Sequence, residues 1–92
     1  MSCEKHALGI PGYSLEELAI KLGDLRYDHL DMFLQLLSDK LLDDAAADAE
    51  RDRPKLCYQL YKAGAKVAWA GYHISNAWYY SKPHMDVKQD NV

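Results

Sequence analysis

The sequence predicts an all-α protein in which two long helices form an antiparallel hairpin that dimerises into a four-helix bundle. Apolar residues recur at three- and four-residue spacing through most of the chain, which is the periodicity of an amphipathic helix. Three prolines and five glycines are too few for a chain dominated by loops. Residues 56–80 hold seven of the ten aromatic side chains and no acidic one. This apolar segment needs more cover than a chain of 92 residues supplies, which favours association.

Length and composition are those of one small globular domain. Apolar residues make up 49% of the chain and charged residues 27%, a balance typical of soluble proteins. The two cysteines, Cys3 and Cys57, are too few for a disulfide framework, and no apolar signal segment precedes them. No stretch is long and apolar enough to span a bilayer. The sequence therefore predicts a cytoplasmic protein without a membrane partner.

The first helix is predicted from a capping signal. Residues 1–13 are expected to be a flexible N-terminal arm, followed by a helical domain over residues 14–82. Ser14 lies three residues before Glu17, the spacing of a capping box, so a helix is expected to start there. It is predicted over about 14–42, with an extension to 50 as the alternative. Gly23 weakens a helix and Asp24 can cap a new one, so the helix is expected either to continue through Gly23 or to break or bend there.

The second helix is predicted from its own start and stop signals. A linker over about 43–53 contains no apolar residue larger than alanine. Asp52 as the cap and Pro54 in the first turn predict a helix over about 53–81. Lys82 and Pro83 are expected to end it, leaving residues 83–92 as a disordered tail.

Sorting the second helix by angle gives two apolar faces. One stripe is suited to packing on the first helix and consists of Leu56, Leu60, Ala63, Val67, Ala70, Ile74 and Trp78. The other is predicted to be the homodimer interface or a docking surface for a protein partner, and its residues are Tyr61, Gly64, Ala68, Trp69, Tyr72 and Tyr79. Gly64 and Ala68 would let another helix approach closely between the rings.

Charge is distributed unevenly along the chain. Ser14 to Asp52 contains eleven acidic and four basic residues, whereas Arg53 to Lys82 contains five basic residues and no acidic one. Opposite signs favour packing of these two segments against each other. The acidic segment also offsets the field that a phosphate backbone requires, so no nucleic-acid partner is predicted.

Three residues form a candidate ligand pocket. Arg26 and His29 fall in the apolar sector of the first helix, and His73 lies on the second. One interpretation is a polar pocket for an anionic ligand. The favoured alternative is structural, with Arg26 reaching the edge of the core and His29 satisfying one hydrogen bond within it.

Metal and nucleophile signals are weak. Asp24, Asp28 and Asp31 share one helical face. Without a Glu-x-x-His or His-Glu-x-x-His motif, they are expected to form a solvated face instead of a metal site. Cys3-x-x-His6 supplies only half of a zinc site. No catalytic triad or dyad has a supporting motif, so no catalytic residue, metal or cofactor is assigned.

The sequence therefore favours a small non-enzymatic helical-bundle protein that acts as an adaptor or regulator through helix–helix contacts. Two alternatives stay open. One is a ligand- or metal-binding bundle, including a small enzyme, centred on Arg26, His29 and His73. The other is a subunit of a hetero-complex.

Overall fold

The computed structural model describes residue 6 and residues 8–90, with residues 84–90 described through their backbone only. In this part of the chain there are three helices, α1 (Leu15–Gly23), α2 (Tyr27–Glu50) and α3 (Pro54–Asp90), and no strand. The predicted all-α class is thus confirmed. The parts of the predicted arm and tail at residues 1–5, 7 and 91–92 lie outside the described residues.

Helix α1 begins at the predicted capping box. The Ser14 hydroxyl accepts a hydrogen bond from the Glu17 amide at 3.0 Å, and the Glu17 carboxylate accepts one from the Ser14 amide at 2.9 Å. The helix ends at Gly23, where the Asp24 amide donates to the Ile20 carbonyl at 2.9 Å and the Leu25 amide donates to the Leu22 carbonyl at 3.2 Å. The capping box is therefore confirmed.

The predicted first helix is interrupted between α1 and α2, so the alternative of a helix break near Gly23 is the one observed. Asp24 closes α1 instead of capping a new helix, and Arg26 is the residue before α2. Arg26 makes no capping hydrogen bond with its own side chain. Asp28 supplies a carboxylate in the first turn instead, and it also accepts the His29 amide at 2.9 Å. A negative group at that position suits the positive end of the helix dipole.

Helix α2 extends through Glu50, so the alternative of an extension to 50 is the one observed and the linker is residues 51–53 instead of 43–53. Asp52 has a positive φ of 59°. Its amide bonds to the Ala49 carbonyl and the Arg53 amide to the Asp48 carbonyl, which together form a Schellman closure of α2. Asp52 thus ends α2, whereas the sequence pattern had made it the cap of α3. Aspartate tolerates this left-handed conformation better than most residues.

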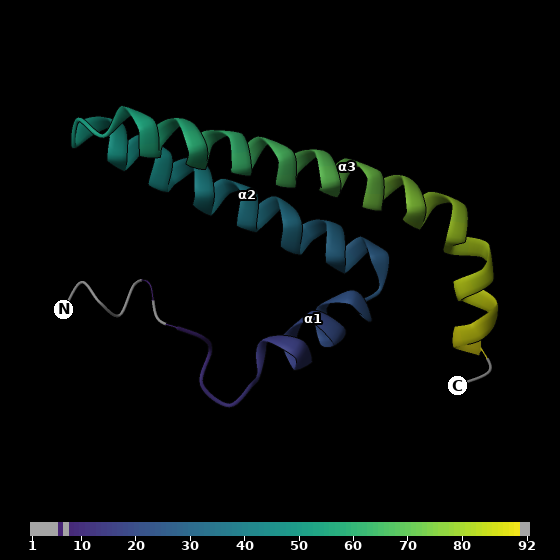
Figure 1. Cartoon of the computed structure of the whole chain (residues 1–92). Helices are drawn as coiled ribbons and strands as arrows, with labels where there is room; N and C mark the ends of the chain where they lie inside the picture. Colours follow the sequence, from purple (N-terminus) through teal and green to yellow (C-terminus); the bar gives the residue numbers. More distant parts are fainter. Residues whose placement is uncertain (1–5, 7, 91–92) are drawn as a thin grey trace.

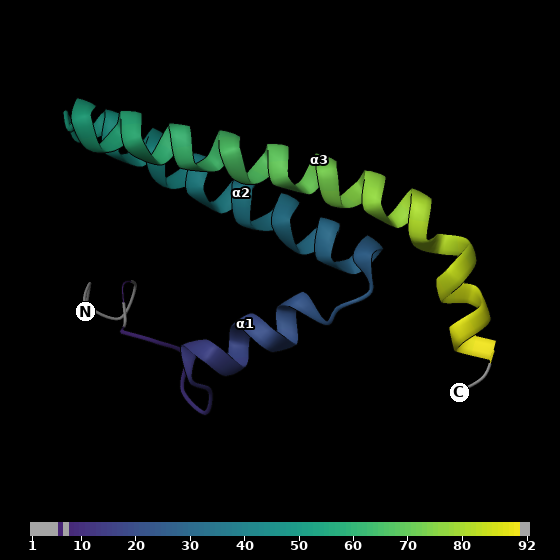
Figure 2. The same cartoon turned by 45° about the vertical axis from the view of Figure 1, so that its right-hand side comes forward.

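Helices α2 and α3 run side by side in opposite directions from this turn (Figures 1 and 2). On α3, the positions that are buried or half-buried toward α2 repeat every three and four residues, as in a coiled coil: Cys57, Leu60, Gly64, Val67, Gly71, Ile74, Trp78 and Ser81. The predicted stripe therefore needs correction. Leu56, Ala63 and Ala70 are exposed.

Two glycines explain why a different face of α3 from the predicted one packs against α2. Gly64 is buried, and a Cβ there would lie 2.9 Å from Leu42 Cδ2 and 3.3 Å from the Ser38 carbonyl oxygen. The Ser38 hydroxyl donates a hydrogen bond to the Gly64 carbonyl at 2.8 Å. Gly71 is buried in the same way, under the side chains of Gln35 and Asp31. The backbones approach most closely where side chains are absent, so the glycines, rather than larger apolar residues, lie at the centre of the contact.

Helix α3 continues past the predicted stop. Pro83 lies inside it, and the backbone remains helical to Asp90, so the expected disordered tail is not observed over residues 83–90. The last part of α3 turns sharply away from the line of its first part (Figures 1 and 2). Proline removes one helical hydrogen bond and crowds the preceding turn, which accounts for a bend near this position.

The molecule is thin. Its extents are 53 × 29 × 15 Å, and the shortest is close to the width of one helix with its side chains. Helix α1 buries no residue, and helix packing in the described chain is essentially confined to α2 and α3. The α2–α3 pair therefore forms a single helical layer, and no other helix of the described residues covers either broad face.

Candidate functional site

One broad face of the α2–α3 pair collects exposed aromatic side chains beside small ones. We call it the aromatic face. It consists of Tyr58, Tyr61, Ala65, Ala68, Trp69 and Tyr72 from α3, and Leu42, Ala46 and Ala49 from α2. Residues seven apart on α3, such as Tyr58, Ala65 and Tyr72, share one angular position, so the face continues along the helix.

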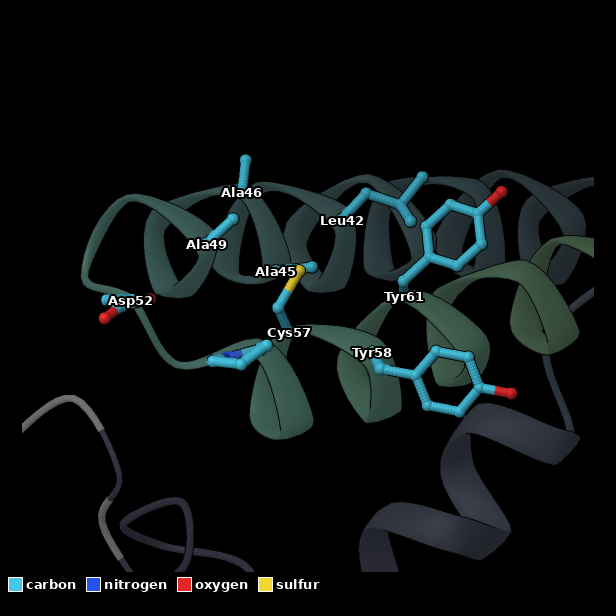
Figure 3. Close-up of a pocket in the computed structure, with 9 residues that line it drawn as sticks. Leu42, Ala45, Ala46, Ala49, Asp52, Cys57, Tyr58 and Tyr61 are labelled. Carbon is cyan, nitrogen blue, oxygen red and sulfur yellow. The ribbon is translucent and has the colours of Figure 1, made fainter.

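The face is hollowed next to the turn between α2 and α3. This turn groove has a volume of about 640 Å³. Its two sides come from different helices, with Tyr58 and Tyr61 on α3 and Leu42 and three alanines on α2 (Figure 3). The half-buried Cys57 lies between them as a free thiol. Among the described residues, Asp52 is the one charged member of the lining. Such a groove offers apolar contact area and little hydrogen bonding.

A second hollow of about 500 Å³ lies farther along α3, lined by Ala65, Ala68, Trp69 and Tyr72. The Trp69 and Tyr72 rings contact each other edge to face with centroids 5.5 Å apart, and the His73 ring lies against both. Despite these contacts Trp69 is 63% exposed and Tyr72 55% exposed. The rings are thus organised among themselves while most of their surface remains open to another molecule.

The opposite flank of the turn has a different character. A hollow of about 730 Å³ there is lined by His6, Leu41, Asp44, Asp48, Arg51, Arg53, Leu56 and Leu60. Asp48 is buried and lies within 3.8 Å of Arg51 and 3.5 Å of Arg53. This charged cluster closes the end of α2, where cations suit the negative end of the helix dipole. The aromatic face is therefore better suited than this charged flank to bury apolar surface against another molecule.

The structure divides the six residues that were predicted as an interface. Tyr61, Trp69, Tyr72 and Tyr79 are exposed, and Ala68 is half-buried in the second hollow. Gly64 differs, because it is buried against α2 of its own chain. Its missing side chain serves the contact within the chain and leaves nothing to present outward.

Sequence reasoning missed Gly71 and the alanines of α2. Gly71 lies seven residues after Gly64 and fourteen after Cys57, a heptad repeat of small residues that could have located the seam. Ala46 and Ala49 were placed in a linker, because alanines without larger apolar neighbours gave no amphipathic signal. Their helix is nevertheless favoured by alanine's high helix propensity.

The three residues of the candidate ligand pocket lie in different settings. Arg26 binds Asp28 through two hydrogen bonds of 2.7 and 2.8 Å, and its guanidinium lies 5.2 Å from the centroid of Trp78. His29 is exposed on α2. His73 is exposed on α3 against Trp69 and Tyr72. Arg26 therefore joins the start of α2 to α3, whereas His29 is exposed and does not lie in the core as the structural alternative expected.

Asp28 is a carboxyl group with a clear electrostatic perturbation. The hydrogen bonds and the charge of Arg26 hold the pKa of Asp28 below its ordinary value, and the His29 side chain and amide act in the same direction. Partial desolvation opposes them. The carboxylate is therefore ionised at neutral pH and held by the guanidinium.

The candidate metal ligands do not gather. Asp28 is paired with Arg26, while Asp31 lies beside Gly71 on the inner side of α2. Among side chains through Pro83 in the described chain, no three His, Cys, Asp or Glu groups are arranged around one point. His6 is exposed, and its proposed companion Cys3 lies outside the described residues.

Comparison with known proteins finds no matching family model, no matching curated protein and no matching solved structure. Among the described residues, none of the helices combines the length and the hydropathy that crossing a bilayer requires.

Proposed function

We propose that this chain is a small helical interaction protein, an adaptor or regulator that works through helix–helix contacts at its aromatic face and associates as a homodimer in a four-helix bundle. One observation carries the proposal. The α2–α3 pair is a single layer, and one of its faces exposes a row of aromatic side chains beside small residues. Large rings next to alanines present the knobs and holes that packed helices need.

The surface area supports the same reading. The chain exposes 7492 Å², whereas a compact protein of 10.5 kDa is expected to expose about 5,400 Å². Its radius of gyration is 16.5 Å, against about 12 Å for a compact domain of this length. Ala45 is the one hydrophobic residue in the described chain that is buried. A second layer would convert the aromatic face into a core.

Mass in solution tests the proposal. Wild-type protein is expected to be a dimer by light scattering, and Tyr61→Asp to be a monomer because it places a charge in the interface. Tyr80→Asp is the matched control. Tyr80 is exposed like Tyr61 but is not part of the aromatic face, so this variant is expected to stay dimeric. Helix content by circular dichroism verifies that both variants fold.

Three outcomes would count against the proposal. A wild-type monomer at high concentration would contradict the homodimer and direct attention to a hetero-complex. Dimers of equal stability for both variants would place the interface on another face. Metal or a chromophore bound at one equivalent per purified chain would favour the ligand-binding class instead.

A further inference from the structure

We propose that the aromatic face is covered by a second copy of this chain with its turn at the same end, so that α2 of each protomer lies along α3 of the other. This inference rests on the proposed dimer and adds its geometry. A two-fold axis that stacks two such layers can lie along the helices or across them. The first choice places turn beside turn and α2 on α3. The second places each turn at the other's open end, with α2 on α2 and α3 on α3.

Charge selects between the two arrangements. Helix α2 contains seven acidic residues and one lysine, whereas α3 from Pro54 to Pro83 contains four lysines and no acidic residue. Stacking α2 on α2 in full overlap would bring Asp39 next to its own symmetry copy, because Asp39 is near the middle of the helix. Stacking α2 on α3 instead brings the exposed carboxylates of α2 toward the lysines in the half of α3 nearest the turn, and electrostatic complementarity of this kind sets the orientation of helical partners.

The contacts within one chain determine which residues of α2 and α3 lie at the same height along the helix axes. We call such residues level. Gly64 lies between the levels of Ser38 and Leu42, and Gly71 lies between those of Asp31 and Gln35. Seven residues forward on α3 thus correspond to seven residues back on α2. By the same step, Tyr58 is level with Ala46, and Tyr72 is level with Met32.

An axis along the helices preserves these levels between protomers. Ala46 then faces Tyr58 of the partner subunit, a small residue against a large ring at the turn groove. Met32, which is 60% exposed, faces Tyr72 of the partner subunit, a thioether against a ring. Both contacts occur twice in the dimer.

The charged edges of the face match at the same levels. Asp43 lies within one residue of the level of Lys62, and Glu50 within one residue of the level of Lys55. These four side chains are exposed in the single chain, on the outer sides of the two helices. With α2 over α3, Asp43 and Glu50 flank the new contact beside the partner's Lys62 and the partner's Lys55.

Single cysteines placed on separate chains test this arrangement. In the full chain with Cys3→Ser and Cys57→Ser, an Ala46→Cys chain is mixed with a Tyr58→Cys chain under mild oxidation. We expect a disulfide-linked dimer on a non-reducing gel after mixing and little from either chain alone. The matched control mixes Ala46→Cys with Met32→Cys, the pair that would meet if the turns lay at opposite ends and the two α2 helices overlapped fully. A disulfide needs Cα atoms within about 7 Å, so the two mixtures discriminate between the arrangements.

Charge reversal provides a second measurement that does not depend on cysteine. Lys62→Glu and Asp43→Lys are each expected to weaken the dimer about tenfold, because each change affects two symmetry-related pairs. The double variant is expected to recover most of the loss. Recovery cannot arise inside one chain, where these residues lie on opposite outer sides of the α2–α3 pair.

Each remaining outcome overturns the inference. Cross-linking of Ala46→Cys with Met32→Cys alone would show the opposite-end arrangement. A dimer that cross-links in neither mixture and shows no charge rescue would place the second copy elsewhere. In both cases the proposed homodimer survives. A monomer by light scattering would overturn the homodimer as well.

Discussion

Two glycines determine how closely α2 and α3 approach. Gly64 is packed against the Leu42 side chain and the Ser38 carbonyl, while Gly71 is covered by the end of the Gln35 side chain. The Gly64 site is walled partly by backbone, which cannot move without disturbing α2. The Gln35 side chain over Gly71 can rotate away. The same residue type thus has different tolerance at two equivalent positions of the seam.

Alanine at the two positions is expected to separate them. Gly71→Ala should leave the free energy of unfolding unchanged or raise it by up to about 1 kcal/mol, since alanine favours helix. The free energy of unfolding of Gly64→Ala should be about 1–2 kcal/mol lower than that of Gly71→Ala, because overpacking against Leu42 and Ser38 offsets that gain. Urea denaturation at one fixed protein concentration measures both. Equal effects would show that α2 is not as close as described.

The Arg26–Asp28 pair gives a pH-dependent expectation. The pKa of Asp28 is depressed in the folded state, so the pair stabilises above the ordinary aspartate pKa of about 3.9 and loses its effect as pH falls through the lower folded value. Arg26→Gln should raise the pKa of Asp28 toward that ordinary value, as measured by carboxyl NMR titration. The difference in stability between wild type and Arg26→Gln should narrow below about pH 4.

A control is available on the same helix. Lys40 pairs with Asp44 at 2.7 Å, away from the start of α2. Lys40→Gln should therefore leave the titration of Asp28 unchanged. An unaltered Asp28 pKa in Arg26→Gln would instead assign the depression to the helix terminus and His29.

At the scale of elements, α1 and the α2–α3 pair behave as separate units. Helix α1 has a complete capping box but buries no residue, whereas α2 and α3 hold each other along most of their common length. A nine-residue helix is marginal in water without such support. The stability of α1 therefore depends on local signals more than on packing.

Two serine variants should show this separation. Ser14→Ala removes the capping box and is expected to cost α1 about 1 kcal/mol, which lowers helix content by circular dichroism while the urea midpoint of the α2–α3 pair stays unchanged. Ser38→Ala removes the buried hydrogen bond to Gly64 and should lower that midpoint, at a cost of about 1 kcal/mol. A shifted midpoint in Ser14→Ala would mean that α1 packs on the rest of the chain.

Local signals made some elements predictable and others not. The Ser14–Glu17 spacing identified the start of α1 because a capping box is complete within four residues. The end of α2 at Glu50 was predicted only as an alternative, and Asp52 was wrongly made the cap of α3, because no neighbouring residue indicates the left-handed conformation that Asp52 takes. Pro83 was expected to stop α3, whereas the backbone bends and continues. Which face of α3 meets α2 depends on close approach at Gly64, a tertiary effect that hydrophobic periodicity does not register.

At the scale of the whole molecule, the exposed area exceeds that of a compact chain of equal mass by about 2,000 Å². A standard stable interface buries about 800 Å² on each partner. The excess is therefore large enough to include one such interface beside the area exposed by residues 8–14, by the separate α1 and by the bent end of α3. The proposed second layer is compatible with this area.

Stability is accordingly expected to depend on protein concentration. If folding and dimerisation are coupled, a tenfold increase in concentration should add about 1.4 kcal/mol to the apparent stability of the dimer and raise Tm. Tyr61→Asp should remove the dependence, and Tyr80→Asp should retain it. A wild-type Tm that is constant over a hundredfold range would argue that the α2–α3 layer is stable by itself.

The turn at residues 51–53 has a consequence for how this chain folds. Because one short connection joins the two helices, pairing can start beside Asp52 and extend outward, each step bringing the next residues within reach. Closing such a connection takes well under a microsecond, so it does not limit the rate. The slow event would then be the meeting of two pre-paired chains. Refolding after dilution from urea should show a rapid first-order phase followed by a second-order one.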